Sequence, residues 1–211
     1  HTISYLQQTK HLCISQVLHP EDIGLEYIST ANKPERPQYG FRFFTDADHA
    51  GNTEVENRRR SQNGAVTLMG DAAVDWYSKV SSVAFATPLI GEAHADFSSG
   101  ASEIYATGNA TCHFLDLSYL YEEAGMSFPI PFELQMDNTT AEAFSKGTVK
   151  RSKLKHIDCR QEWVKTLRNK SVMYAVHVNT NDNLADLFTK ILSAPKFVEL
   201  RDQMMYDPHA R

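Results

Sequence analysis

Hydrophobic and polar positions alternate in three short stretches early in the chain, and each stretch predicts a β-strand. Residues 41–46 alternate aromatic side chains with others and end on Thr45-Asp46, a pattern typical of a half-buried strand that carries a carboxylate at its end. Residues 65–69 and 74–78 each follow a Gly-containing turn signal, Asn63-Gly64 and Gly70-Asp71. We therefore predict an antiparallel meander of three strands.

The second half of the chain predicts a long helix followed by further strands and helices. Residues 94–124 contain no proline and are apolar around much of the helical circumference, which is typical of a buried central helix, and Gly125 marks its end. Residues 132–137 and 172–178 alternate as strands do. Shorter helices are predicted over residues 140–145, 157–167, 181–190 and 195–205. This order indicates an α/β domain, in which helices pack on a mixed sheet.

Composition narrows the class of protein. With 211 residues, 42% of them hydrophobic, the chain can form one main domain with an appendage. The appendage is predicted in residues 1–38, where prolines interrupt an irregular connector and residues 1–18 have the pattern of a short helix. The chain begins with His instead of Met, which indicates a piece of a longer polypeptide. The apolar runs are too short to span a bilayer, and no secretory signal is recognisable.

Net charge and cysteine content give expectations about nucleic-acid binding, metal or disulfide sites and cellular setting. The net charge of −5 argues against nucleic-acid binding by bulk charge, although basic residues cluster at 58–60 and 150–155. Such a cluster can equally be a solvated surface. Three scattered cysteines without a C-x-x-C pair suggest neither a zinc site nor a disulfide framework, and they favour an intracellular setting.

Four acidic residues stand at positions where a carboxylate is unexpected. Asp46 and Asp137 end predicted strands, Asp186 lies early in a late helix, and Glu103 lies in a small or apolar stretch of the central helix. If the first and fourth strands are neighbours and the long helix crosses them, three of these acids converge on one rim. A set of oxygen ligands suits Mg²⁺ or Mn²⁺, and two such ions can hydrolyse a phosphodiester.

A structural explanation of the same residues stays open at this point. Acids that follow strands are common caps, Asp137 beside Asn138 can simply start a helix, and a helical Glu can face solvent. Spacing alone does not decide between these roles and a metal site.

Seven short motifs occur in one order between about residue 40 and residue 192. They are TDADHAG (45–51), RSQNG (60–64), WYSK (76–79), SSGASEIYA (98–106), MDN (136–138), SKLKHID (152–158) and NLADLFTK (183–190). In this order they resemble the ribonuclease H domain at the carboxyl end of the Pol polyprotein of copia-type LTR retrotransposons. Residues 5–10 also resemble the segment that joins this domain to the preceding reverse transcriptase.

The resemblance implies a fold and an activity. The fold would be α/β and ribonuclease H-like, a five-stranded mixed sheet with helices on both faces. It would occupy residues 39–192, between a connector from the end of a reverse transcriptase (1–38) and a C-terminal helical tail (193–211). The activity would be metal-dependent hydrolysis of the RNA strand of RNA–DNA hybrids during reverse transcription.

The resemblance also implies the residues of the active site. Two Mg²⁺ ions, with Mn²⁺ as a substitute, would be held by Asp46 (not Asp48), Glu103, Asp137 and Asp186. Asp46 would bridge both ions, Glu103 and Asp137 would complete one coordination sphere, and Asp186 the other. The hybrid would be held through its phosphates and 2′-hydroxyls, by residues that can also be ordinary surface residues: Arg58, Arg59, Arg60, Asn138, Lys153 and Lys155.

The remaining expectations concern partners and single residues. The partners would be the hybrid and the reverse transcriptase in the same polyprotein, with no membrane, in a cytoplasmic virus-like particle or the nucleus. The family usually has Trp at His49 and Glu at Ala101. His177 could shuttle protons, but a half-buried strand histidine is favoured; His156 has no assigned role. Trp76 and Trp163 are predicted in the core.

Two other functions stay open. One is a catalytically silent module that only extends the nucleic-acid track of a reverse transcriptase. The other is a nuclease of the same fold with a different specificity, such as one that cuts DNA.

Overall fold

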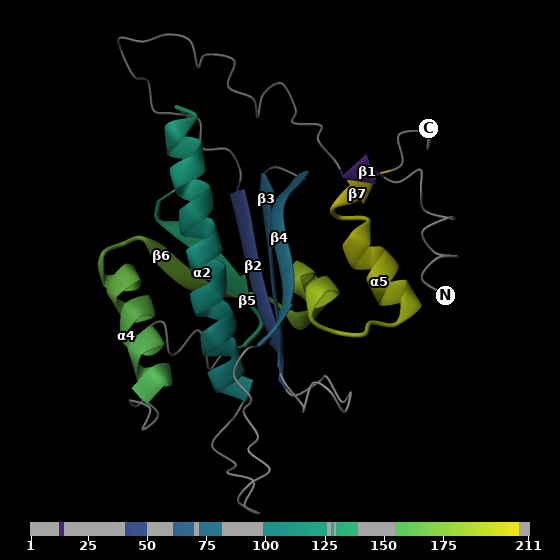
Figure 1. Ribbon diagram of the computed structural model, residues 1–211. Coiled ribbons are helices and arrows are strands. Elements are labelled where there is room, and N and C mark those ends of the chain that lie inside the picture. Colours follow the sequence, from purple (N-terminus) through teal and green to yellow (C-terminus); the bar gives the residue numbers. More distant parts are fainter. Residues whose placement is uncertain are drawn as a thin grey trace, which may run out of the picture.

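The computed structural model describes residues 13–14, 41–49, 61–69, 72–81, 99–125, 128, 130–138 and 155–206. Within these residues the main feature is a five-stranded sheet with the strand order β4-β3-β2-β5-β6 (Figure 1). Its strands are β2 (Phe41–Asp48), β3 (Gln62–Met69), β4 (Ala72–Val80), β5 (Phe132–Met136) and β6 (Met173–His177). The helix predicted over residues 140–145 lies outside the described residues.

The sheet is mixed, as the sequence predicted. β2, β3 and β4 pair in antiparallel fashion and form the expected meander, whereas β5 runs parallel to β2, and β6 runs parallel to β5. A parallel neighbour requires a crossover connection, and the long helix α2 (Ser99–Glu123) lies between β4 and β5 in the sequence. The central helix and the adjacency of β2 and β5 are therefore confirmed.

Helices cover both faces of this sheet. Figure 1 shows α2 and α4 (Lys155–Asn169) on one side and α5 (Ala194–Arg201) on the other. On the α2 side, three fully buried aromatic rings form the centre of the core, with Phe43 lying 4.9 Å from Phe114 and 5.1 Å from Phe132 between ring centroids. The second core contains Phe44, Val66, Leu68, Leu184 and Leu200. The ribonuclease H-like fold predicted from the sequence is confirmed.

The predicted helix over residues 181–190 is wrong in type. Two short 3-10 helices, η1 (Thr180–Asp182) and η2 (Leu184–Phe188), take its place and are separated at Asn183. The Asn183 side chain donates to the backbone oxygen of Thr45 in β2 and accepts from the N–H of Ala185. Because Asn183 has an extended backbone and is bonded to the sheet, a continuous α-helix cannot pass through it.

The turn predicted at Asn63-Gly64 is also wrong, because both residues lie inside β3. Gly64 pairs with Asp46 in the adjacent strand. A Cβ atom at Gly64 would lie 2.7 Å from both Phe188 Cβ and Thr189 Cγ2. The glycine is thus required by the close approach of η2 to the sheet.

The predicted end of the central helix is confirmed. Gly125 has a φ of 74°, the left-handed conformation that commonly follows the last helical residue, and its N–H donates to the oxygen of Glu122. Among the described residues, no helix combines the length and apolar character that crossing a membrane requires.

Two core predictions have opposite outcomes. Trp163 of α4 is partly buried and packs against the core beneath α2. Trp76 is 49% exposed, so its predicted core position is wrong. Trp76 lies on β4, an edge strand of the sheet, and faces away from Tyr77, whose side chain packs against that core.

The ends of the described chain meet in a separate small sheet. β1 (Cys13–Ile14) pairs antiparallel with β7 (Met205–Tyr206), beside α5 in Figure 1. Cys13 and Ile14 are in a strand, and the other residues of the segment in which a short helix was predicted (1–18) lie outside the described residues. The rest of the predicted connector lies outside the described residues, and the helix predicted over residues 195–205 ends at Arg201.

Candidate metal centre

The pairing of β2 with β5 places two carboxylates side by side. Phe44 is level with Gln135 in this parallel pair, so Asp46 and Asp137, each two residues further along, reach the same level. Asp46 is 1% exposed inside β2, and Asp137 directly follows β5. Because parallel neighbours end at the same edge of a sheet, both acids lie at the rim that the sequence predicted.

A third carboxylate reaches this rim from the face of the sheet that lies opposite α2. η2 packs on β2 and β3 and carries Asp186, which is 3% exposed. One carboxylate oxygen from each of Asp46, Asp137 and Asp186 lies within 4.8 Å of the other two. These three residues are called the acidic cluster below.

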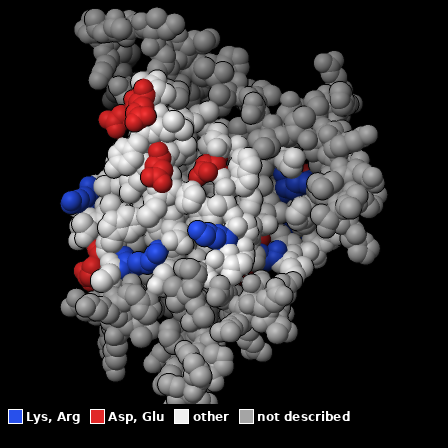
Figure 2. Space-filling view, viewed as in Figure 1, with Lys and Arg blue, Asp and Glu red and all other residues white. Residues whose placement is uncertain are grey.

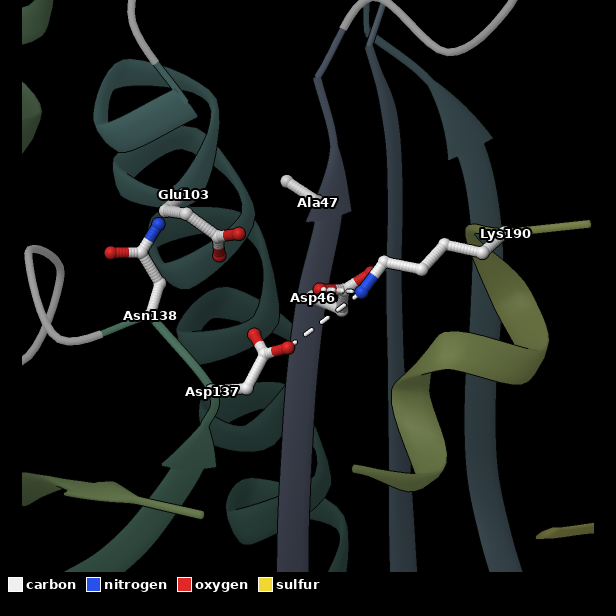
Figure 3. A pocket seen from close by; sticks show the side chains of 6 residues that line it. All are labelled: Asp46, Ala47, Glu103, Asp137, Asn138 and Lys190. Atoms are coloured by element: carbon white, nitrogen blue, oxygen red, sulfur yellow. Dashed lines mark hydrogen bonds and ion pairs between the residues drawn. The ribbon is translucent and has the colours of Figure 1, made fainter. Parts of the chain in front are cut away.

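Glu103 completes the set from α2. Its side chain extends from the helix toward β2 and lines the same pocket as Asp46 and Asp137 (Figure 3). The carboxylate accepts a hydrogen bond from the backbone N–H of Ala47. Its second oxygen, Oε2, is buried and has no hydrogen-bond partner. A buried carboxylate oxygen without a donor is costly, so this atom fits a place beside a cation.

The pKa values of these acids reflect crowding and burial. Burial raises the pKa of Glu103 well above its ordinary value, and the negative charges of Asp46 and Asp137 raise it further. Burial likewise raises the pKa of Asp186 to about 6 and that of Asp46, against the opposing effect of Lys190. Burial therefore disfavours the ionised forms of Asp46, Asp186 and Glu103 unless positive charge is added.

Lys190 supplies one such charge. Its Nζ lies 2.7 Å from Asp186 Oδ1, 3.1 Å from Asp46 Oδ1 and 3.7 Å from Asp137 Oδ2. Figure 3 shows the ammonium group beside Asp46. Burial by itself lowers the pKa of Lys190, but the three carboxylates raise it above its ordinary value. The neighbouring Thr189 hydroxyl donates to Asp46 Oδ2.

Thr189 and Lys190 belong to the motif at residues 183–190, but no role was predicted for either residue. The available signal was the spacing of Asp186 and Lys190, which is four residues, as in a helical ion pair. No role was predicted either for a group of hydrogen-bonded polar side chains beside Glu103.

In this group Ser102 Oγ lies 2.8 Å from His49 Nδ1 and 2.9 Å from Ser61 Oγ. These hydrogen bonds connect the first turn of α2 to residues next to β2 and β3.

The donor set fits a divalent metal ion. All four acids offer hard oxygen ligands of the kind that Mg²⁺ and Mn²⁺ prefer. Asp46, Asp137 and Asp186 can share one ion, and Glu103, with an unsatisfied oxygen, lines a pocket together with Asp46 and Asp137. The structure thus brings three of the predicted acids together and places the fourth beside two of them; their catalytic role stays a prediction.

The predicted substrate-binding residues are only partly described. Asn138 lines the pocket next to Asp137. Arg58, Arg59, Arg60 and Lys153 lie outside the described residues, as do the side chains of Lys155 and His156. His177 is exposed at the end of β6, so the prediction that it is half-buried is wrong. Its position as the last residue of the strand leaves its side chain uncovered.

The five-stranded mixed sheet with helices on both faces is a ribonuclease H-like fold. No family model matches the chain. Its sequence relatives are retrovirus-related Pol polyproteins from transposons, as the motifs predicted. They include those of transposon TNT 1-94 of Nicotiana tabacum and transposon RE2 of Arabidopsis thaliana, each 27% identical over 154 residues, 73% of this chain and 10% of the relative. The chain therefore spans about a tenth of their length.

A similar solved structure is that of RNase H1 from the halophilic archaeon Halobacterium salinarum NRC-1. It is 16% identical in sequence, and the match covers 71% of this chain and 93% of that chain, with a TM-score of 0.44.

Proposed function

We propose that this domain is a metal-dependent endonuclease that hydrolyses the RNA strand of RNA–DNA hybrids during reverse transcription of a copia-type retrotransposon. The observation that carries the proposal is the convergence of Asp46, Asp137 and Asp186 within 4.8 Å, with Glu103, which has an unsatisfied oxygen, in the pocket that Asp46 and Asp137 also line. The relationship to transposon Pol polyproteins supports this reading.

Each acid has a defined role in this proposal. Two divalent ions would be held by the four acids: Asp46 would be a ligand of both, Glu103 and Asp137 of one, and Asp186 of the other. Two Mg²⁺ or Mn²⁺ ions in such a site supply an activated water and stabilise the leaving oxygen of a phosphodiester. The protein's own contribution is orientation: Thr189 fixes one oxygen of Asp46, and the backbone N–H of Ala47 fixes Glu103.

The hybrid would be held through its phosphates and 2′-hydroxyls instead of its base sequence. Asn138 lines the pocket next to Asp137, and the other proposed contacts are Arg58, Arg59, Arg60, Lys153 and Lys155. Residues 39–192 would be the nuclease domain, preceded by a connector from reverse transcriptase and followed by a tail. The reaction would take place inside the cell, in a virus-like particle or the nucleus.

The test is a cleavage assay on a labelled RNA–DNA hybrid with Mg²⁺ or Mn²⁺. Asp46→Asn removes a shared ligand, and we expect cleavage to fall at least about a hundredfold, more than the loss of an outer-sphere partner causes. Asp48→Asn is the matched control, because Asp48 lies on the same strand outside the acidic cluster. Full activity in Asp46→Asn would refute the proposal.

A substrate panel separates the two other functions. Hybrid binding without cleavage, with either metal, would indicate a catalytically silent module of a reverse transcriptase. Preferential cutting of double-stranded DNA or RNA would indicate a nuclease of other specificity.

A further inference from the structure

The acidic cluster already contains a cation that belongs to the protein. Lys190 Nζ approaches Asp186 Oδ1 to 2.7 Å and Asp46 Oδ1 to 3.1 Å, which are distances of charge-assisted hydrogen bonds. Asp137 Oδ2 lies 3.7 Å away. One ammonium group therefore interacts with all three carboxylates that could share a metal ion.

The ammonium and a divalent ion need the same oxygen atoms. Mg²⁺ binds carboxylate oxygens at about 2.1 Å, so an ion in contact with Asp186 Oδ1 would lie within about 5 Å of Nζ if the lysine stayed in place. Two positive charges at that distance in a partly buried site repel strongly. The lone pairs that accept from Lys190 are also those that a metal ion would use.

Lys190 is placed so that it can withdraw. Its side chain is 29% exposed, in contrast to 1% for Asp46 and 5% for Asp186. It lies two residues beyond the end of η2, and the flexible four-carbon stem of a lysine can carry the ammonium outward. The acids are held in place by the sheet and by η2, whereas the Lys190 ammonium that neutralises them is partly exposed to solvent.

We propose that Lys190 is an internal counter-ion that competes with divalent metal for the acidic cluster and so sets the metal concentration that the site requires. The inference rests on the metal-binding part of the proposed function. With the ammonium in place, the crowded carboxylates are neutralised and the rim stays folded; metal binding displaces the ammonium toward solvent.

Mn²⁺ alone is the probe, titrated into the purified chain by calorimetry. Lys190→Met removes the charge, and Lys190→Gln removes it while keeping an N–H donor. We expect both variants to bind Mn²⁺ at least about tenfold more tightly than the unmodified chain, since a hydrogen bond between charged groups no longer has to be broken. We also expect a lower melting temperature in EDTA and a larger rise on adding Mn²⁺.

Lys165→Met is the matched control, because Lys165 also pairs with a carboxylate, that of Glu162 at 3.0 Å, but on the surface of α4. Its Mn²⁺ affinity should not change. Should Lys190→Met fail to fold in EDTA, Lys190→Gln gives the measurement, with circular dichroism as the check of folding.

Equal or weaker Mn²⁺ binding by folded Lys190 variants would overturn the inference, because Lys190 would then support the ligands instead of competing with metal. That result leaves the metal centre intact. Absence of Mn²⁺ binding in the unmodified chain and in both variants, with no effect of Asp46→Asn, would instead refute the metal centre and with it the proposed function.

Discussion

Asp46 is the residue on which the rim depends. Its carboxylate is 1% exposed and interacts with Thr189 through Oδ2 and with Lys190 through Oδ1. A buried carboxylate needs such donors to remain ionised. Both donors come from the end of η2, so the position of η2 controls the charge state of a residue on β2.

Thr189→Val tests this dependence, since valine keeps the shape of threonine but lacks the hydroxyl. We expect the metal-free domain to lose about 1.5–3 kcal/mol of unfolding free energy, the usual contribution of a hydrogen bond to a charged group. Urea denaturation in EDTA measures it. Thr189→Ser, which keeps the donor, should lose clearly less; equal losses would show that packing, not the hydroxyl, is responsible.

At the scale of elements, η2 is the part that assembles the site. It buries Leu184 and Ala185 in the second core and carries Asp186 to the rim, and the residues that follow it reach Asp46. Asn183 connects its start to β2. η2 and the two residues that follow it thus provide one acid, one hydroxyl and one cation, and the packing of η2 against β3 determines where all three lie.

Gly64→Ala should disturb the packing of η2 against the sheet. The new Cβ would come within 2.7 Å of Phe188 and Thr189, so η2 must move away from the sheet. We expect a loss of about 1–3 kcal/mol in unfolding free energy, as for other overpacked positions, together with weaker Mn²⁺ binding because Asp186 moves with η2.

Gly108→Ala is the control for this substitution. A Cβ at Gly108 in α2 would meet only the Arg160 side chain, with the nearest atom, Nη1, at 3.3 Å. Alanine is favoured over glycine in a helix by about 1 kcal/mol, so stability should be unchanged or slightly higher. A Gly64→Ala variant as stable as this control would contradict the close seat of η2.

At the scale of the whole molecule, charge is unevenly distributed. The chain carries a net charge of −5, but on the face in Figure 2 most of the described acidic side chains gather in the upper part. The described basic side chains lie mostly below them, toward the end of the sheet where β2 finishes (Figures 1 and 2). A polyanion that approaches the rim from this face would meet less repulsion than the net charge suggests.

The stability of the whole domain without metal should depend on pH through the acidic cluster. Burial raises the pKa of Asp186 from 3.8 to about 6, so the folded domain binds this proton more tightly than the unfolded chain. The resulting stabilisation is fully present below about pH 4 and is lost as the pH rises through about 6.

The measurement compares the unmodified chain with Asp186→Asn in EDTA across this pH range. Relative to the variant, the unmodified chain should lose unfolding free energy between about pH 4 and pH 7. Asp182→Asn, at an exposed position of η1, should show no such trend relative to the unmodified chain. A stability difference between the chain and Asp186→Asn that does not change with pH would contradict the raised pKa.

Much of the fold was predictable because its signals are local. The alternation in residues 41–46 and 132–137 reflects the backbone geometry of β2 and β5, and the length of the apolar stretch before Gly125 reflects that of α2. The motifs predicted which four acids would meet, and the parallel pairing of β2 and β5 agrees with that expectation for Asp46 and Asp137. These properties depend on residues close together in the sequence or on a recognisable order of motifs.

Other features depended on contacts that the sequence does not display. Asn63-Gly64 is a sequence typical of a turn, but Gly64 lies in a strand because η2 packs closely against it. Trp76 is of a residue type common in cores, but it lies on an edge strand and its side chain is exposed to solvent. The sequence by itself determined the strands, the central helix and the identity of the acids. Only the tertiary structure decided that Lys190 lies among them, because the position of Lys190 depends on how η2 packs on β2 and β3.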